Sequence, residues 1–434
     1  MSAGAVQASG LRPEGQASGL RPQASGDAEL RVDIVEGRDA FIQLEKAWNE
    51  ALGKGPRDEP MLRHEWVRAF IENFAPGATL RTFVAKAGKE IHAAVPLIET
   101  QERNADTCFV PMTTWSIPVN DHSQRGGVLL GRRWQEGLDL IWQTLQGQRW
   151  DRLRLRDLPE GAGEWELRRM AEGAGMPCGM WVSLRSPYLP LPRQASGVRP
   201  PASGEKPEAS SLKPEKQKQK QKVEKLPTAD VRFEQVEAAL DGKFRQNLRR
   251  RRRRLAEQGE VKYVLLDGKD QKALDEGLAD FFTIEGSGWK GEGGTAIAQR
   301  PELVGFYTQI ARDAAKRGAL ALGFLELAGK RIAAHLSIIQ AGRHFLLKLG
   351  YDESLHEFSP GQQLVSDAIR DACARGLVEF DFLGPCMEWK LDWESKLRAH
   401  TWLTIFRATP RGKLVHQARF TLWPIAKKLI KKES

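Results

Sequence analysis

The residues best suited to bind an anionic group lie in one short stretch, Ser359–Gln363, which reads Ser-Pro-Gly-Gln-Gln. They follow an apolar run and open a segment with helical apolar spacing, which predicts a strand, a loop and a helix. Ser359 suits the N-cap, Pro360 the first helical position, and Gln362 would complete a capping box. Gly361 would let a ligand approach the amide N–H groups of the helix start. The pattern predicts a seat for phosphate or pyrophosphate, with an ordinary capped helix as the alternative.

A second candidate is a pair of opposite charges on two predicted strands. Lys348 lies within the apolar run Phe345–Tyr351, and Asp381 lies within Val378–Leu383. Because a lysine inside an apolar strand is costly unless it is paired, we expect Asp381 to be its partner. Such a pair is either a functional charged site or an ion pair that only joins two strands.

The net charge of +10 is concentrated in two segments. Arg193–Leu226 has a net charge of +5 and Lys243–Arg254 has +8, a sum of 13, so the rest of the chain carries −3. The first segment is rich in Pro, Ser, Lys and Gln, which is typical of a solvated linker. A unit QASG(L/V)RP recurs only in this linker and in the N-terminal tail, at Gln7–Pro13, Gln16–Pro22 and Gln194–Pro200. We therefore expect a disordered low-complexity tail at 1–27 and a disordered basic linker at 193–226.

The second basic segment is predicted to be a helix over Phe233–Leu255, since its apolar residues recur at about helical spacing. Six consecutive arginines, Arg249–Arg254, lie on its C-terminal part. Consecutive residues spread around a helix, so they cannot form a single stripe that reads a groove. Either they clamp a phosphorylated or other anionic ligand, with Arg249, Arg250 and Arg253 as the candidates, or they form a solvated helix end.

The linker separates two halves, 28–192 and 227–434, that resemble each other. Each contains two apolar strands joined by an Ala-Gly-Lys turn, a hairpin pattern. Each hairpin follows a helix with aromatic anchors and precedes a strand, a helix and a further strand. The similarity indicates a duplicated α/β module, with chance similarity of two hairpins as the alternative. The matching segments are the hairpins Leu80–Ile98 and Leu322–Ile339, the helices His64–Phe74 and Leu303–Arg317, and the strands Leu153–Pro159 and Val378–Pro385.

Several spaced motifs of the second half, from Ala229 to about Phe420, together resemble a known family. They are Phe244-Arg-Gln-Asn-Leu-Arg-Arg, Ser287-Gly-Trp-Lys-Gly, Leu347-Lys-Leu-Gly-Tyr-Asp, Ser359-Pro-Gly, Phe380-Asp-Phe-Leu-Gly and Trp389-Lys-Leu-Asp-Trp. In this order they resemble the CelD/BcsL group of GNAT acetyltransferases, which has the BioF2-like acetyltransferase domain and is related to the Fem-type aminoacyl transferases. The resemblance implies an α/β (α+β) fold of two tandem GNAT-like modules, each a mixed, mostly antiparallel sheet flanked by helices. The first half matches only in outline.

The resemblance also implies roles for particular residues. Acyl-CoA would be the co-substrate, bound by Ser359, Pro360, Gly361, Gln362 and Gln363. The turn before them has one glycine where the GNAT signature Q/R-x-x-G-x-G/A has more, so aminoacyl-tRNA or another activated donor stays an alternative. Acyl transfer to an amine needs a positioned donor, a stabilised oxyanion and a proton acceptor. The candidate catalytic residues are Lys348, Asp352 and Asp381, and the candidate substrate-binding residues are Trp289, Lys290, Tyr351, Trp389 and Lys390.

Other features narrow the class of protein. Four dispersed cysteines form no CxxC pair, which argues against a disulfide framework or a zinc ribbon, and we expect no metal. There is no long apolar run or signal-peptide core, which predicts a cytoplasmic protein. The basic amphipathic segment Val415–Lys432 either lies on a membrane surface or is a closing helix.

We expect an acyl-CoA-dependent N-acyltransferase of EC class 2.3.1. Its acceptor would be an amine of a small molecule or of a polysaccharide or lipid precursor, and the resemblance associates it with exopolysaccharide biosynthesis. The alternatives are a Fem-type aminoacyl transferase acting on a cell-wall precursor, or a non-catalytic protein that binds an anionic ligand or nucleic acid. We do not expect nucleic acid as a partner of the favoured enzyme.

Overall fold

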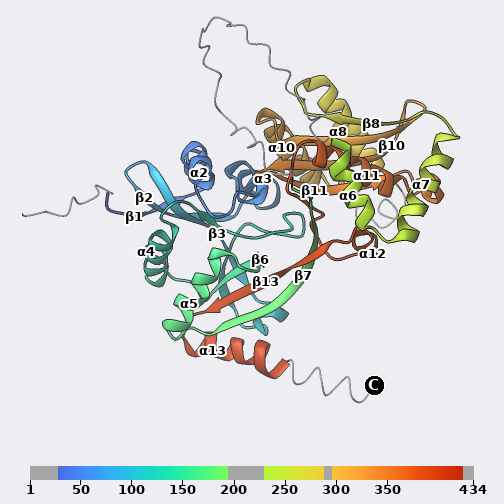
Figure 1. The fold of residues 1–434 in the computed structure, drawn as a ribbon. Coiled ribbons are helices and arrows are strands. Elements are labelled where there is room, and N and C mark those ends of the chain that lie inside the picture. The colour runs from blue at the N-terminus through green and yellow to red at the C-terminus, as the bar shows by residue number, and fades with distance from the viewer. Residues whose placement is uncertain (1–27, 194–228, 288–295, 424–434) are drawn as a thin grey trace, which may run out of the picture.

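The chain folds into two lobes that share one mixed sheet, as the computed structural model shows for residues 28–193, 229–287 and 296–423 (Figure 1). The first lobe is built mainly from the first half of the chain. Its elements are β1 (Arg31–Glu36), α1 (Arg38–Ile42), α2 (Glu45–Leu52), α3 (His64–Phe74), β2 (Thr79–Ala87), β3 (Glu90–Glu102), β4 (Met112–Ser116), β5 (Leu129–Leu130), α4 (Trp134–Gln146), β6 (Arg152–Pro159), α5 (Glu166–Gly173) and β7 (Cys178–Pro190).

The second half of the chain follows the same general order, with two more helices at its start and one more, α13, at its end. Its elements are α6 (Ala229–Ala239), α7 (Gly242–Ala256), β8 (Val261–Leu266), α8 (Gln271–Glu285), α10 (Pro301–Lys316), β9 (Leu320–Leu327), β10 (Lys330–Gln340), β11 (Arg343–Tyr351), the 3-10 segment η5 (Glu353–Phe358), α11 (Pro360–Ala374), β12 (Glu379–Asp381), α12 (Glu388–Leu391), β13 (Lys396–Phe406) and α13 (Pro410–Gln417).

The sheet confirms the predicted fold class of two tandem modules. Its strand order is β1-β2-β3-β4-β6-β13-β7-β12-β11-β10-β9-β8. In each module the first strands pair antiparallel, and the last pair is parallel, β4 with β6 and β11 with β12. Both predicted hairpins form, with Gly88 at φ 59° in the first turn and Gly329 at φ 81° in the second.

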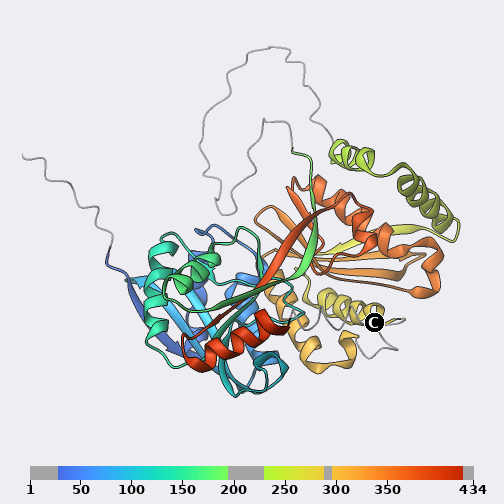
Figure 2. The ribbon, with the colours of Figure 1, turned by 90° about the horizontal axis from the view of Figure 1, so that it is seen from below.

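The two modules exchange their last strands. β7 follows the first module and pairs with β12 of the second, whereas β13 follows the second module and pairs with β6 of the first. β7 and β13 also pair with each other and run between the lobes (Figure 2). The sheet is therefore continuous across the division that the sequence predicts at the linker.

The lobes also share a hydrophobic core where α3 of the first half packs on α10 of the second. The ring of Trp66 lies edge-on to Phe306 with centroids 5.3 Å apart, and Phe74 lies 5.0 Å from the same ring. Burial of several aromatic side chains at one contact favours a fixed arrangement of the halves.

One helix prediction is wrong. The single helix expected over Phe233–Leu255 is two helices, because the chain breaks at Leu240–Asp241. The Asp241 side chain accepts a hydrogen bond from the Phe244 amide at 3.0 Å and caps α7, which stabilises a new helix start. The predicted tail and linker, and the end of the segment Val415–Lys432, lie outside the described residues.

Candidate active site

A cavity of about 480 Å³ opens where β11 and β12 part. The two strands pair over only three residues, Arg343–Phe345 against Glu379–Asp381. Beyond them β11 runs on to Tyr351, whereas the chain after β12 turns away through Leu383 at φ 51° and Gly384 at φ 61°. The lining residues include Gln124, Glu285, Ser287, Leu346–Tyr351, Glu353, His356, Ser359, Gly361, Gln362, Phe382–Pro385, Met387, Trp389 and Lys390.

The N-terminus of α11 opens onto this cavity, as the sequence predicts, but its cap differs. Ser359 is in the left-handed region at φ 48° and its side chain makes no cap hydrogen bond, so the expected capping box is wrong. The Ser359 hydroxyl instead accepts a hydrogen bond from Arg251 at 2.7 Å. The first-turn amides of an α-helix have no acceptor within the helix, and the helix dipole adds positive potential there. This end of α11 therefore suits a phosphate group.

Gly361 lets the start of α11 lie close to β11. A Cβ atom at this position would stand 3.0 Å from the Tyr351 ring, so a larger side chain would fill the space between them. Gln362 also lines the cavity, and its side chain is held by α12 and the turn after it, because it donates to the Trp389 carbonyl at 3.1 Å and accepts from the Trp393 indole at 2.7 Å. Gln363 does not line the cavity: it is buried against α7 and donates to the Leu248 carbonyl.

Lys390 from α12 is a buried cation at the cavity wall. Its Nζ donates to the carbonyl oxygens of Leu383 at 2.6 Å and Pro385 at 3.1 Å. The pKa of Lys390 is lowered to about 8, mainly by burial and in part by the nearby Lys348, while Asp381 and Cys386 act in the opposite direction. A lysine with a pKa near neutrality can change its protonation state in the working pH range.

The predicted pairing of Lys348 with Asp381 is wrong. Asp381 is fully buried, does not line the cavity and is held by two arginines, with Oδ2 at 2.6 Å from Arg125 and 3.1 Å from Arg398. Lys348 does line the cavity, with its Nζ 5.6 Å from the centre of the Tyr307 ring. The sequence missed these partners because Arg125 lies in the first half and Arg398 on the exchanged strand.

The remaining predicted residues fall into three groups. Tyr351 and Trp389 line the cavity, whereas Asp352 accepts from the Ser354 amide at 3.1 Å and caps η5. Trp289 and Lys290 lie outside the described residues. Arg249, Arg250 and Arg253 are exposed and do not line the cavity; Arg249 pairs with Glu237 at 3.1 Å.

Part of the arginine run holds α7 against the start of α11. Arg252 pairs with Asp367 at 2.8 Å and Arg254 pairs with Glu357 at 2.6 Å, in addition to the Arg251–Ser359 contact. Of the six arginines, Arg251 is therefore the one that contacts a residue of the cavity, and the sequence did not single it out.

The first half of the chain also contributes to the cavity. Gln124 lines it and donates to the Leu347 carbonyl at 3.4 Å. His122 lies 3.1 Å from the Tyr307 hydroxyl, and burial lowers its pKa to about 4, with Lys348 and Arg300 acting in the same direction. His122 and Gln124 lie in a polar stretch that can be seen in the sequence, but nothing in the sequence shows that this stretch lies beside β11.

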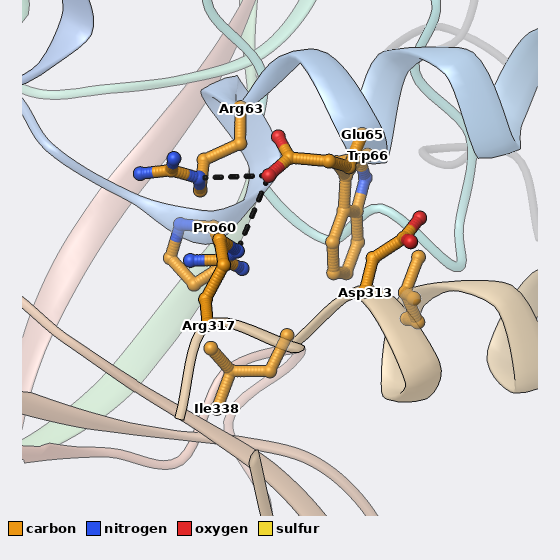
Figure 3. A pocket seen from close by; sticks show the side chains of 8 residues that line it. Pro60, Arg63, Glu65, Trp66, Asp313, Arg317 and Ile338 are labelled. Carbon is orange, nitrogen blue, oxygen red and sulfur yellow. Dashed lines mark ion pairs between the residues drawn. The ribbon is translucent and has the colours of Figure 1, made fainter. Parts of the chain in front are cut away.

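A second, much smaller space lies between α3 and α10 (Figure 3). It measures about 10 Å³, and the Glu65 carboxylate beside it pairs with Arg63 at 3.5 Å and Arg317 at 3.2 Å. This volume suits no ligand, so the space belongs to the contact between the halves. Across the described ranges, no group of three or more His, Cys, Asp or Glu side chains is arranged to hold a metal ion. No helix in the same ranges is long and apolar enough to cross a membrane.

Comparison with known proteins agrees with this geometry. A family model described as an acetyltransferase (GNAT) domain matches residues 242–391, which include α11, β12 and Lys390. The second half therefore contains a GNAT-type acetyltransferase domain, and the enzyme class it indicates is a transferase. No curated protein matches the chain.

The solved structures that resemble the chain include FemX, at 11% identity and a TM-score of 0.54, over 86% of this chain and 98% of that one. A C-terminal domain of a putative lysylphosphatidylglycerol synthetase from Agrobacterium fabrum has 9% identity and a TM-score of 0.45, over 88% and 96% of the two chains. A tandem GNAT protein from the clavulanic acid biosynthesis pathway has 11% identity and a TM-score of 0.39, over 87% and 100%. Because the sequence identity to FemX is only 11%, this likeness shows a shared fold alone.

Proposed function

We propose that the chain is an N-acyltransferase that takes an acyl group, in the first instance acetyl, from acyl-CoA and transfers it to an amine. The observation that carries the proposal is the meeting of three features at one cavity. These are the parted strands β11 and β12, the N-terminus of α11 without a side-chain cap, and the buried Lys390. The match of residues 242–391 to the acetyltransferase domain supports the same chemistry.

The donor would bind with its phosphates at the start of α11. The amide groups around Gly361 and the cation of Arg251, which reaches Ser359, supply the positive potential that a pyrophosphate needs. The remainder of the donor would follow the gap between β11 and β12 towards Lys390. A volume of about 480 Å³ is in the range of small-molecule and cofactor sites.

Lys390 would stabilise the charge that develops during transfer. Its ammonium form has three N–H donors, of which two are used by the Leu383 and Pro385 carbonyls, so one is left for the reacting carbonyl oxygen. As the amine nitrogen attacks, the C–N bond forms, the C–S bond breaks, the sulfur leaves as thiolate, and the amine proton passes to solvent.

The acceptor would be an amine that reaches the cavity between the two halves. Gln124 of the first half and Lys348 and Trp389 of the second all line this cavity. We propose a small molecule, or a polysaccharide or lipid precursor, as the carrier of the amine, and the resemblance to the CelD/BcsL group favours the polysaccharide. In this proposal the modules are 28–192 and 227–434, and the chain acts in the cytoplasm.

The test is a transfer assay with acetyl-CoA and a panel of amines. We expect Lys390→Met to lower kcat by about 10²–10³-fold, as the loss of an oxyanion donor does elsewhere. Because the charged form of Lys390 is the active one, kcat of the wild type should fall as pH rises through about 8. Lys390→Arg should keep its activity above that pH, since arginine stays protonated.

The control is Lys262→Met, on the edge strand β8, which removes an exposed lysine that pairs with Glu260 at 2.8 Å and does not line the cavity. If Lys390→Met is as active as this control, Lys390 takes no part in transfer. If the wild type transfers an amino acid from aminoacyl-tRNA and nothing from acyl-CoA, the donor in this proposal is wrong and the Fem-type alternative holds.

A further inference from the structure

A row of hydrogen bonds joins the first half of the chain to Lys390. Arg125, which lies between β4 and β5, is fully buried and donates through Nη2 to Asp381 Oδ2 at 2.6 Å. The other carboxylate oxygen, Oδ1, accepts from the Leu383 amide at 3.0 Å. The carbonyl of the same Leu383 accepts from Lys390 Nζ at 2.6 Å. Three successive contacts therefore lead from Arg125 to Lys390.

The residue in the middle of this row has an unusual backbone. Leu383 is fully buried and has φ 51°, in the left-handed region that residues with a side chain rarely adopt. Such a conformation is costly and persists only where the surroundings hold it. The Asp381 carboxylate, bonded to the Leu383 amide, is one group that holds it.

We propose that Arg125 and Asp381 are positioning residues, which fix the Leu383 turn and through it place Lys390 at the cavity. The first half of the chain is then part of the catalytic apparatus, because it supplies Arg125. The inference rests on the proposed function for the role of Lys390, but the contacts themselves are independent of the reaction.

The burial of Asp381 excludes a direct contact with substrate but not an effect on Lys390. Both of its oxygens are occupied, by Leu383 on one side and by Arg125 and Arg398 on the other. The charged groups that act on Lys390 are Asp381 on β12, Cys386 in the following loop and Lys348 on β11. Of these, Asp381 is also bonded to the turn that holds Lys390.

The experiment is a titration of Lys390 in the full chain by NMR with ¹³C-labelled lysine, the signal being assigned by its loss in Lys390→Arg. Asp381→Asn keeps a similar shape but removes the charge. We expect its Lys390 titration midpoint to fall by about one pH unit. We also expect the falling limb of the kcat–pH profile to move by the same amount, with KM for the donor within about twofold.

The matched control is Arg68→Gln. Arg68 also joins the halves, through Asp313 on α10 at 2.7 Å, but it shares no partner with Arg125 or Asp381 and does not line the cavity. If the contacts around Asp381 are only structural, Asp381→Asn and Arg68→Gln will lower the melting temperature and leave the Lys390 midpoint in place. That result overturns the inference.

A second variant covers the case in which Asp381→Asn does not fold. Arg398→Gln removes one of the two cations on Asp381 from a partly exposed position, so more of the negative charge acts on Lys390 and the midpoint should rise. An unchanged midpoint contradicts the inference. If the wild type transfers no acyl group at all, the proposed function fails, whereas the NMR midpoints still decide whether Asp381 controls Lys390.

Discussion

Replacing Gly350 with alanine tests how closely α8 approaches β11 at the cavity. A Cβ atom on Gly350 would stand 2.6 Å from Glu285 Cα and 2.9 Å from Glu285 N. Carbon atoms in contact prefer about 3.5 Å, so the strand and the helix end must separate by about 0.9 Å. Both obstructing atoms belong to the backbone and cannot rotate away. Overpacking of this kind costs about 1–3 kcal/mol, which corresponds to a melting temperature about 2–6 °C lower.

The same displacement should reach the cavity, because Glu285 and Ser287 line it and Ser287 donates to the Tyr351 carbonyl at 2.8 Å. We expect Gly350→Ala to weaken donor binding as well as to melt earlier, as measured by calorimetry and thermal unfolding. The control is Gly173→Ala at the end of α5, where no atom lies within 4 Å of the added Cβ. If Gly350→Ala has the same melting temperature as this control and binds the donor as the wild type does, then α8 does not pack as closely against β11 as described.

Three further predictions concern stability. His344 is fully buried against Phe380, and neither ring nitrogen has a hydrogen-bond partner in the part of the chain that the structure describes. Burial lowers the pKa of His344, so below about pH 6.5 the unfolded chain binds a proton at this residue that the folded chain does not, and the free energy of unfolding falls. The variant His344→Phe should therefore melt at a higher temperature than the wild type, most of all at pH 5. Ser359→Gly should be about 1–2 kcal/mol more stable than Ser359→Ala in thermal unfolding, because both lack the hydroxyl and only glycine suits φ 48°. Arg57→Met should destabilise the chain by about 3–5 kcal/mol, because it leaves the buried Glu164 carboxylate without the guanidinium that pairs with it at 2.8 Å, whereas Glu59 keeps Arg125 and Arg343. A melting temperature near that of the wild type would contradict this.

The elements of each module could be predicted because their signals are local. The Ala-Gly-Lys turns and the aromatic anchors of α3 lie within a few residues of the structure they determine. Both turns have their glycine in the left-handed region, Gly88 at φ 59° and Gly329 at φ 81°, as tight turns require. The strand–loop–helix that opens on the cavity was predicted for the same reason.

The exchange of strands and the partners of Asp381 could not be predicted, because they depend on contacts between distant parts of the chain. Arg125 and Asp381 are separated by 256 positions, and no periodicity or spacing links them. The alternation of β11 predicted that Lys348 would pair with Asp381. In the structure Asp381 pairs instead with Arg125 from the first half and Arg398 on β13. The capping box failed for a local reason, since Ser359 is left-handed and cannot present its hydroxyl to the α11 amides.

The most direct test of the account is a calorimetric titration of the full chain with acetyl-CoA. The account predicts saturable binding of one molecule per chain, lost in Gly361→Phe, whose side chain would enter the cavity beside Tyr351. The same binding should persist in Gly173→Phe on α5, where the added Cβ has open space. Absence of binding by the wild type, or equal binding by Gly361→Phe, would contradict the claim that the gap between β11 and β12 is an acyl-donor site.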